Sequence, residues 1–129
     1  MTPTATRDVD ARFMPHGIVV EQAGRVADDL GLPRWWLNEQ ASVYISGKDD
    51  PGKRRVFDHP GLRVMAASPD HIFAMKALAA RTRDIDDLRL LADIVGVDSA
   101  DAALRICAEF YPDEPVSPRS AAVLRELFG

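Results

Sequence analysis

The stretch from Ser68 to Val95 constrains the fold most strongly, because it is typical of two consecutive helices that both need a core. Ser68 is a favoured N-cap and Pro69 suits the first helical position. The pattern breaks near Thr82, and Asp84 can cap the second helix, which Gly96 is placed to end. The apolar residues recur at helical spacing in both segments: Ile72, Met75, Leu78 and Ala79, then Ile85, Leu88, Leu91, Ala92 and Val95.

Lys76 does not fit this apolar pattern, since it falls on the side of the first helix that Phe73 and Ala80 share. A long cation there must either reach water or face an anion. In one interpretation it binds phosphate and is oriented by an acid of the following run, Arg83-Asp84-Ile85-Asp86-Asp87. In the other it only reaches solvent, Asp84 is a cap, and Asp86 and Asp87 complement the helix dipole. The local sequence alone favours the second interpretation.

The remaining pattern predicts a mixed α/β fold, α+β in kind, with a small mixed sheet and a helical C-terminal half. We expect one domain over residues 1–129, with a sheet-containing part at 1–67 and a helical part at 68–129. The expected strands are 7–13, 43–45, 55–57 and 62–67, the last two joined as a hairpin, with an exposed loop at 46–55. The other expected helices are 18–30, with Val19, Ala23, Val26 and Leu30 on its apolar face, a short one at 33–41, and 100–110 and 118–128.

Composition limits the function classes. A hydrophobic share of 47% is enough for a core, and a net charge of −4 argues against broad, charge-driven binding of nucleic acid. The single cysteine, Cys107, lies on an apolar helical face, where packing is expected, and it suits a reducing compartment. The sequence contains no apolar run of about 18 residues and no signal-peptide core. We therefore expect a cytoplasmic protein without a membrane partner.

Two carboxylates stand on the first expected strand. In the run Asp8-Val9-Asp10 a spacing of two residues places both carboxylates on one face of a strand, within reach of one divalent cation. Magnesium prefers oxygen ligands and keeps waters that a triphosphate can replace. The alternative is a solvated strand face, which the pattern Asp-x-Asp alone favours.

A basic run of four residues lies in the expected loop: Lys48, Lys53, Arg54 and Arg55. These cations could contact RNA phosphates, but Asp49 and Asp50 lie within the same run, and a solvated loop is the alternative. Trp35 and Trp36 could stack on a base or pack in the core.

Four segments together resemble a family of small bacterial nucleotidyltransferase-fold proteins, related to the AbiEii-like toxins of type IV toxin–antitoxin systems and to the MenT-type toxins. These segments are RDVDARF, VADDLGLPRWWLN, VFDHPGLRVMAASPDHIFAMKALAARTRDIDDLRLLA and SPRSAAVLRELF. The resemblance implies Mg²⁺-dependent transfer of a nucleotide from a nucleoside triphosphate to an RNA or protein acceptor. It assigns the metal to Asp8 and Asp10, catalytic roles to Lys76, Asp84 and Asp87, and triphosphate binding to Lys76 and Arg83. A cognate antitoxin is an implied partner.

The family's glycine-serine motif, which holds the triphosphate before the Asp-x-Asp strand, has no counterpart among the residues that precede Asp8. From this we expect a chain that begins late or a truncated relative, with impaired transfer and an exposed sheet edge that favours a homodimer. Two alternatives remain from other classes. One is a non-catalytic module that binds a protein partner or a second copy, and the other is a small RNA-binding domain.

Overall fold

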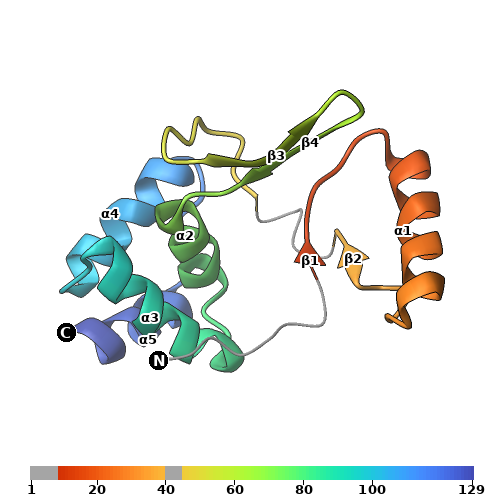
Figure 1. The fold of residues 1–129 in the computed structure, drawn as a ribbon. Coiled ribbons are helices and arrows are strands. Elements are labelled where there is room, and N and C mark those ends of the chain that lie inside the picture. Colours follow the sequence, from red (N-terminus) through yellow and green to blue (C-terminus); the bar gives the residue numbers. More distant parts are fainter. Residues whose placement is uncertain (1–8, 40–44) are drawn as a thin grey trace. The chain divides into compact units, whose positions relative to one another are not determined.

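The computed structural model describes residues 9–39 and 45–129, which fall into two compact units, 1–45 and 46–129 (Figure 1). The expectation of a single domain stays a prediction. The mixed α/β class is confirmed. In the described part of the chain, no helix is both long and apolar enough to cross a bilayer.

The first unit is a β-α-β arrangement. Strand β1 (Val9–Asp10) pairs in parallel with β2 (Leu37–Asn38), and helix α1 (His16–Leu30) connects them. The expected strand at 7–13 is therefore shorter within the described residues, and the expected strand at 43–45 lies almost wholly outside them.

Two expectations for the first unit are wrong. No helix forms at 33–39: this segment is a turn followed by β2, whose pairing with β1 fixes an extended backbone. The apolar face predicted for α1 is wrong in part: Ala23 is buried and Val19 half-buried as predicted, but Val26 and Leu30 are 37% and 69% exposed and Ala27 is buried instead. The chain after α1 lies close to this alanine face, where the Trp36 indole Nε1 donates to the Ala23 carbonyl at 2.9 Å.

The second unit begins with the expected hairpin. Strands β3 (Arg54–His59) and β4 (Leu62–Ala66) pair antiparallel around the turn Pro60-Gly61. The register changes between Arg55 and Phe57, which leaves Val56 as an extra residue in a β-bulge. The described strands thus form two separate pairs, one parallel and one antiparallel.

Helices fill the rest of the second unit: α2 (Pro69–Ala79), the short 3₁₀ turn η2 (Thr82–Asp84), α3 (Ile85–Val95), α4 (Ala100–Phe110) and α5 (Pro118–Phe128). The predicted cap at Ser68 is confirmed, and Ser99 and Ser117 cap α4 and α5 in the same way: each of the three hydroxyls accepts the backbone N–H three residues later at 3.1 Å. Gly96 ends α3 in the left-handed conformation, with φ 88°.

Helix α2 is the centre of this unit, since it packs against α3, α4 and α5 (Figure 1). It is therefore buried on several sides, and the single stripe predicted from Ile72, Met75 and Leu78 is only half-buried. The fully buried residues of α2 are Phe73, Ala74 and Ala77. The main core cluster comprises Phe73, Ala77, Leu88, Ala92, Val97, Ala103, Cys107 and Leu124.

Candidate functional site

Three of the residues singled out from the sequence meet at the junction of α2 and α3. Lys76 stands in the last turn of α2, and its Nζ lies 3.0 Å from Asp87 Oδ2 and 3.4 Å from Asp84 Oδ1. The junction is sharp because Ala80, the C-cap of α2, adopts the left-handed conformation with φ 45°. The chain then turns back through η2, which brings the first turn of α3 beside the end of α2.

Asp84 is the buried member of this cluster, with a side chain only 3% exposed. Its Oδ2 accepts from Arg81 Nε at 2.9 Å and from the Arg81 backbone N–H at 3.3 Å, so both carboxylate oxygens are engaged. Burial by itself raises the pKa of Asp84, but the hydrogen bonds from Arg81 and the charges of Lys76 and Arg81 outweigh it and hold the pKa below its ordinary value. Asp84 is therefore ionised throughout the neutral range.

The expected capping role of Asp84 is wrong. Its carboxylate makes no capping hydrogen bond to α3, because it points back to the Arg81 N–H and to the two cations. Asp86 and Asp87 do lie in the first turn of α3, where they favour the helix dipole. Arg83 is exposed, and no ion pair to it occurs in the described ranges, so the structure does not bring it into the cluster.

Sequence reasoning missed two arginines of this junction. Arg81 holds Asp84, and Arg119 of α5 donates to the Ala79 carbonyl at 2.7 Å and the Ala80 carbonyl at 3.2 Å. Carbonyls at the end of a helix lack intrahelical partners, and a cation is a favourable partner for them. The position of Arg81 beside the acidic run was a usable signal, whereas nothing local marks Arg119, which acts across about forty residues.

The predicted metal pair is not tested by this geometry. Asp8 lies outside the described residues, and Asp10 is described only by its backbone in β1. Among the described residues, no three histidine, cysteine, aspartate or glutamate side chains are grouped as metal ligands. The cluster at Lys76 does not suit Mg²⁺ either, because both oxygens of Asp84 already face cations.

A second polar cluster, around His71, was also missed. His71 Nδ1 lies 3.2 Å from Asp50 Oδ2, and its Nε2 accepts the Ser46 backbone N–H at 3.1 Å, so the proton of a neutral ring is on Nδ1. Burial raises the pKa of Asp50, but hydrogen bonds from Ser68 and His71 outweigh it and leave the pKa lowered. The ring also stacks on Phe110 at 4.7 Å. This network is fully satisfied and joins the loop at 46–50 to the start of α2.

The other residues singled out from the sequence differ in their burial and secondary structure. Trp36 is half-buried and hydrogen-bonded, whereas Trp35 is 54% exposed. Cys107 is packed as predicted, and burial raises the pKa of its thiol to about 11. Of the expected loop at 46–55, Arg54 and Arg55 belong to β3 instead.

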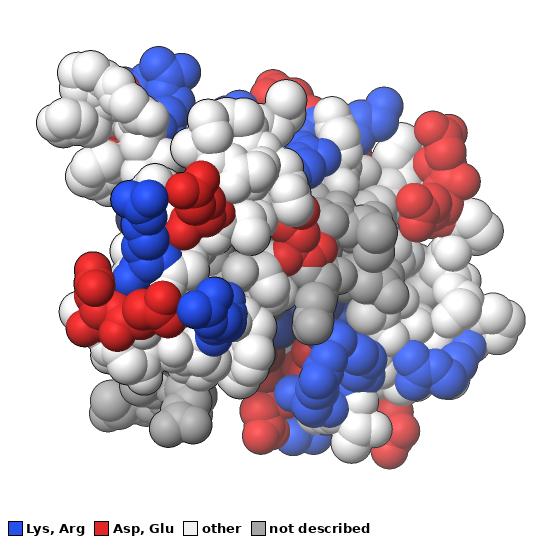
Figure 2. All heavy atoms as spheres, turned by 90° about the vertical axis from the view of Figure 1, so that its right-hand side faces the viewer, with Lys and Arg blue, Asp and Glu red and all other residues white. Residues whose placement is uncertain are grey.

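Basic side chains do not gather in one patch on the face drawn in Figure 2. Figure 2 shows lysine and arginine side chains in separate groups, with acidic and uncharged residues between them, on the face that it draws. Comparisons with protein-family models, with curated protein sequences and with solved structures found no match.

Proposed function

We propose that this chain is a nucleotidyltransferase-fold, toxin-like protein that acts in the cytoplasm, and that its reaction transfers a nucleotide from a nucleoside triphosphate to an RNA or protein acceptor. One observation supports the proposal above all. The family resemblance assigns Lys76, Asp84 and Asp87 to substrate handling, and the Nζ of Lys76 lies within ion-pair distance of both carboxylates. The three residues come from both sides of a turn, so their spacing in the sequence alone does not require this.

The three side chains suit different tasks. Asp84 is buried and held by Arg81, so it fixes the direction of Lys76 as a positioning residue. Asp87 is 57% exposed, so a phosphate oxygen can take its place at Lys76 Nζ. The released Asp87 carboxylate can then accept the proton of the attacking hydroxyl. The new bond joins the acceptor oxygen to the α-phosphorus, and the bond to pyrophosphate breaks.

Two further roles rest on the sequence pattern. Arg83 is exposed near the same turn and is proposed as a second cation for the triphosphate. Asp8 and Asp10 are proposed to bind Mg²⁺. A titration with Mn²⁺, followed by NMR line broadening, tests this pair. Broadening that leaves Asp8 and Asp10 unaffected would contradict the assignment.

Nucleotide binding by single variants tests the proposal. We expect Lys76→Gln to weaken binding of a nucleoside triphosphate, measured by calorimetry with Mg²⁺, by about ten- to a hundredfold, the usual effect of a lost hydrogen bond to a charged group. Arg89→Gln, which removes an exposed cation from α3, is the matched control and should bind as the wild type does. Labelled nucleoside triphosphates and total tRNA then test for transfer. Equal binding by wild type and Lys76→Gln would overturn the proposal.

A non-catalytic interaction module is the second candidate, and a specific observation favours it. Lys76 is already paired with two carboxylates, so the cluster also has the geometry of a purely structural link between α2 and α3. For this candidate the partner is an antitoxin or a second copy of the chain. A wild-type chain that binds no nucleotide but forms a dimer by light scattering would support it over transfer.

A further inference from the structure

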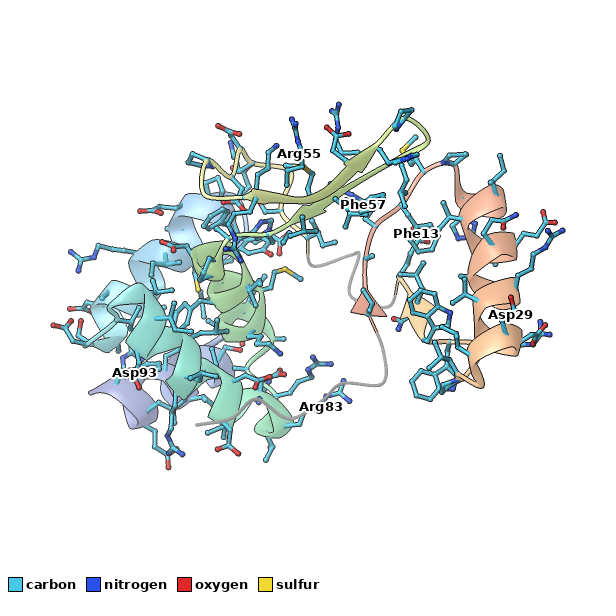
Figure 3. All side chains as sticks on the ribbon, viewed as in Figure 1. Phe13, Asp29, Arg55, Phe57, Arg83 and Asp93 are labelled. Carbon is cyan, nitrogen blue, oxygen red and sulfur yellow. The ribbon has the colours of Figure 1, made fainter. Side chains whose placement is uncertain are left out.

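The hairpin β3–β4 has two chemically different faces. Asp58 lies 3.0 Å from Arg55 and 3.7 Å from Arg63, so these charged residues share one face. Phe57 and His59 stack on each other, with ring centroids 6.1 Å apart, and occupy the other face. Figure 3 shows Arg55 and Phe57 on opposite sides of the hairpin. In a regular strand residues 55 and 57 would share a face, so the bulge at Val56 creates this separation.

The aromatic face also carries a cation, Arg54. Arg54 pairs with Ala66, and Phe57 pairs with Val64. Ala66 and Val64 are two residues apart on β4 and share a face of the strand, so Arg54 lies on the same face of the hairpin as Phe57. In the described part of the chain no ion pair involves Arg54, whereas Arg55 and Arg63 are both near Asp58. Phe57 is 49% exposed, and Arg54 and His59 are exposed as well.

Basic residues are enriched in the segment that contains this hairpin. Residues 46–67 contain five lysines and arginines against three aspartates, whereas the whole chain contains 16 basic against 20 acidic residues. One of the three, Asp50, is buried against His71, which leaves the exposed part of the segment more positive still. This part of an acidic protein therefore attracts anions locally.

We propose that the aromatic face of the hairpin binds single-stranded RNA. Unpaired bases stack on Phe57 and His59, and phosphates contact Arg54 and the neighbouring Lys53. Exposed aromatic rings next to cations are the combination that single strands require, because every base has a π-face and every linkage a charge. A duplex keeps its bases stacked inside and cannot use the rings. This binding is independent of nucleotide transfer.

The test is fluorescence anisotropy with a labelled oligouridine of about 12 nucleotides and a duplex RNA of equal length, without any nucleoside triphosphate. We expect the wild type to prefer the single strand. Phe57→Ala should weaken that binding about tenfold, and Phe57→Trp should retain it, since one stacked base contributes on the order of a tenfold change in affinity. Leu62→Ala removes an equally exposed but non-aromatic side chain from the same face and should change binding little.

Salt dependence tests the cationic contact separately. Arg54→Gln should weaken binding at low salt and reduce the slope of log affinity against log salt by about one. The control Arg105→Gln removes an exposed cation of α4 and should leave the slope unchanged. Unchanged binding by Phe57→Ala with a wild-type circular dichroism spectrum would overturn the proposal. Equal losses for Leu62→Ala and Phe57→Ala would also overturn it, and would indicate an apolar protein contact instead. Because no triphosphate is present, neither outcome depends on the transfer reaction.

Discussion

Replacing Asp84 by asparagine tests whether the cluster at the α2–α3 junction stabilises the fold. Asparagine has nearly the same shape and keeps one acceptor oxygen, but it removes the charge that Lys76 and Arg81 face. Leaving a fully buried charge without its ion-pair partner lowers the free energy of unfolding by about 3–5 kcal/mol. Here the side chains of Lys76 and Arg81 are 27% and 49% exposed, so both can turn to water. We therefore expect a loss nearer that of one hydrogen bond to a charged group, about 2 kcal/mol.

The loss should depend on pH. The pKa of Asp84 is lower in the folded protein than in the unfolded chain, so its ionised form stabilises the fold above the unfolded value. That contribution is lost as the pH falls below about 4, the ordinary aspartate value, and through the folded pKa. The difference between wild type and Asp84→Asn should thus be full at neutral pH and should shrink in acid. Asp50, whose pKa is also lowered, is present in both proteins and cancels.

Urea denaturation at neutral pH and at several acidic values measures this difference directly. A loss of about 2 kcal/mol should lower the urea midpoint without changing the slope m, and should lower the melting temperature by roughly 10 °C. The control is Asp86→Asn, since Asp86 is 96% exposed and lies 3.9 Å from Arg89. An equal midpoint for wild type and Asp84→Asn at neutral pH would refute the reasoning. A difference that persists undiminished in acid would refute the role given to the charge.

Three further results follow from packing. Gly52→Ala should lower the urea midpoint, because a Cβ there would lie 2.9 Å from the Ser68 Cβ, whereas Gly47→Ala meets nothing within 4 Å and should be tolerated. Cys107, buried and with a pKa raised to about 11, should react with a thiol reagent at neutral pH only after unfolding, which absorbance of the released chromophore follows. Leu124→Ala should cost about 2–5 kcal/mol by denaturation, because the side chain is fully buried in the main cluster.

The features that sequence predicted well depend on a few neighbouring residues. The serine caps of α2, α4 and α5 require only a hydroxyl and an N–H three residues later. The turn Pro60-Gly61 of the hairpin is equally local. For the same reason the end of α3 at Gly96 was predictable, because a left-handed residue is needed there.

The features that sequence did not predict depend on distant partners. The segment 33–41 was predicted to be helical, but Trp35 lies in a turn and the pairing of Leu37 with Val9 makes the backbone after it extended. Aspartate is a favoured capping residue, yet the carboxylate of Asp84 faces Lys76 and Arg81 in the packed structure. The single apolar stripe predicted for α2 would suit packing against one neighbouring helix, whereas this helix packs against α3, α4 and α5. Local propensity gives way wherever tertiary packing supplies a better partner.

A double variant can separate stability from function at Lys76, which the sequence allowed either to bind phosphate or only to reach solvent. Replacing a buried ion pair by apolar groups of similar size is often neutral or stabilising, whereas removing one partner alone is costly. Lys76→Met with Asp84→Asn should therefore recover part of the stability that Asp84→Asn alone loses, since methionine keeps the apolar stem and removes the charge that has lost its partner. If the cluster only joins α2 to α3, the double variant should regain stability and should bind nucleotide as the wild type does. If Lys76 also holds a triphosphate, urea stability should recover while nucleotide binding stays lost, and this divergence assigns the lysine to a site.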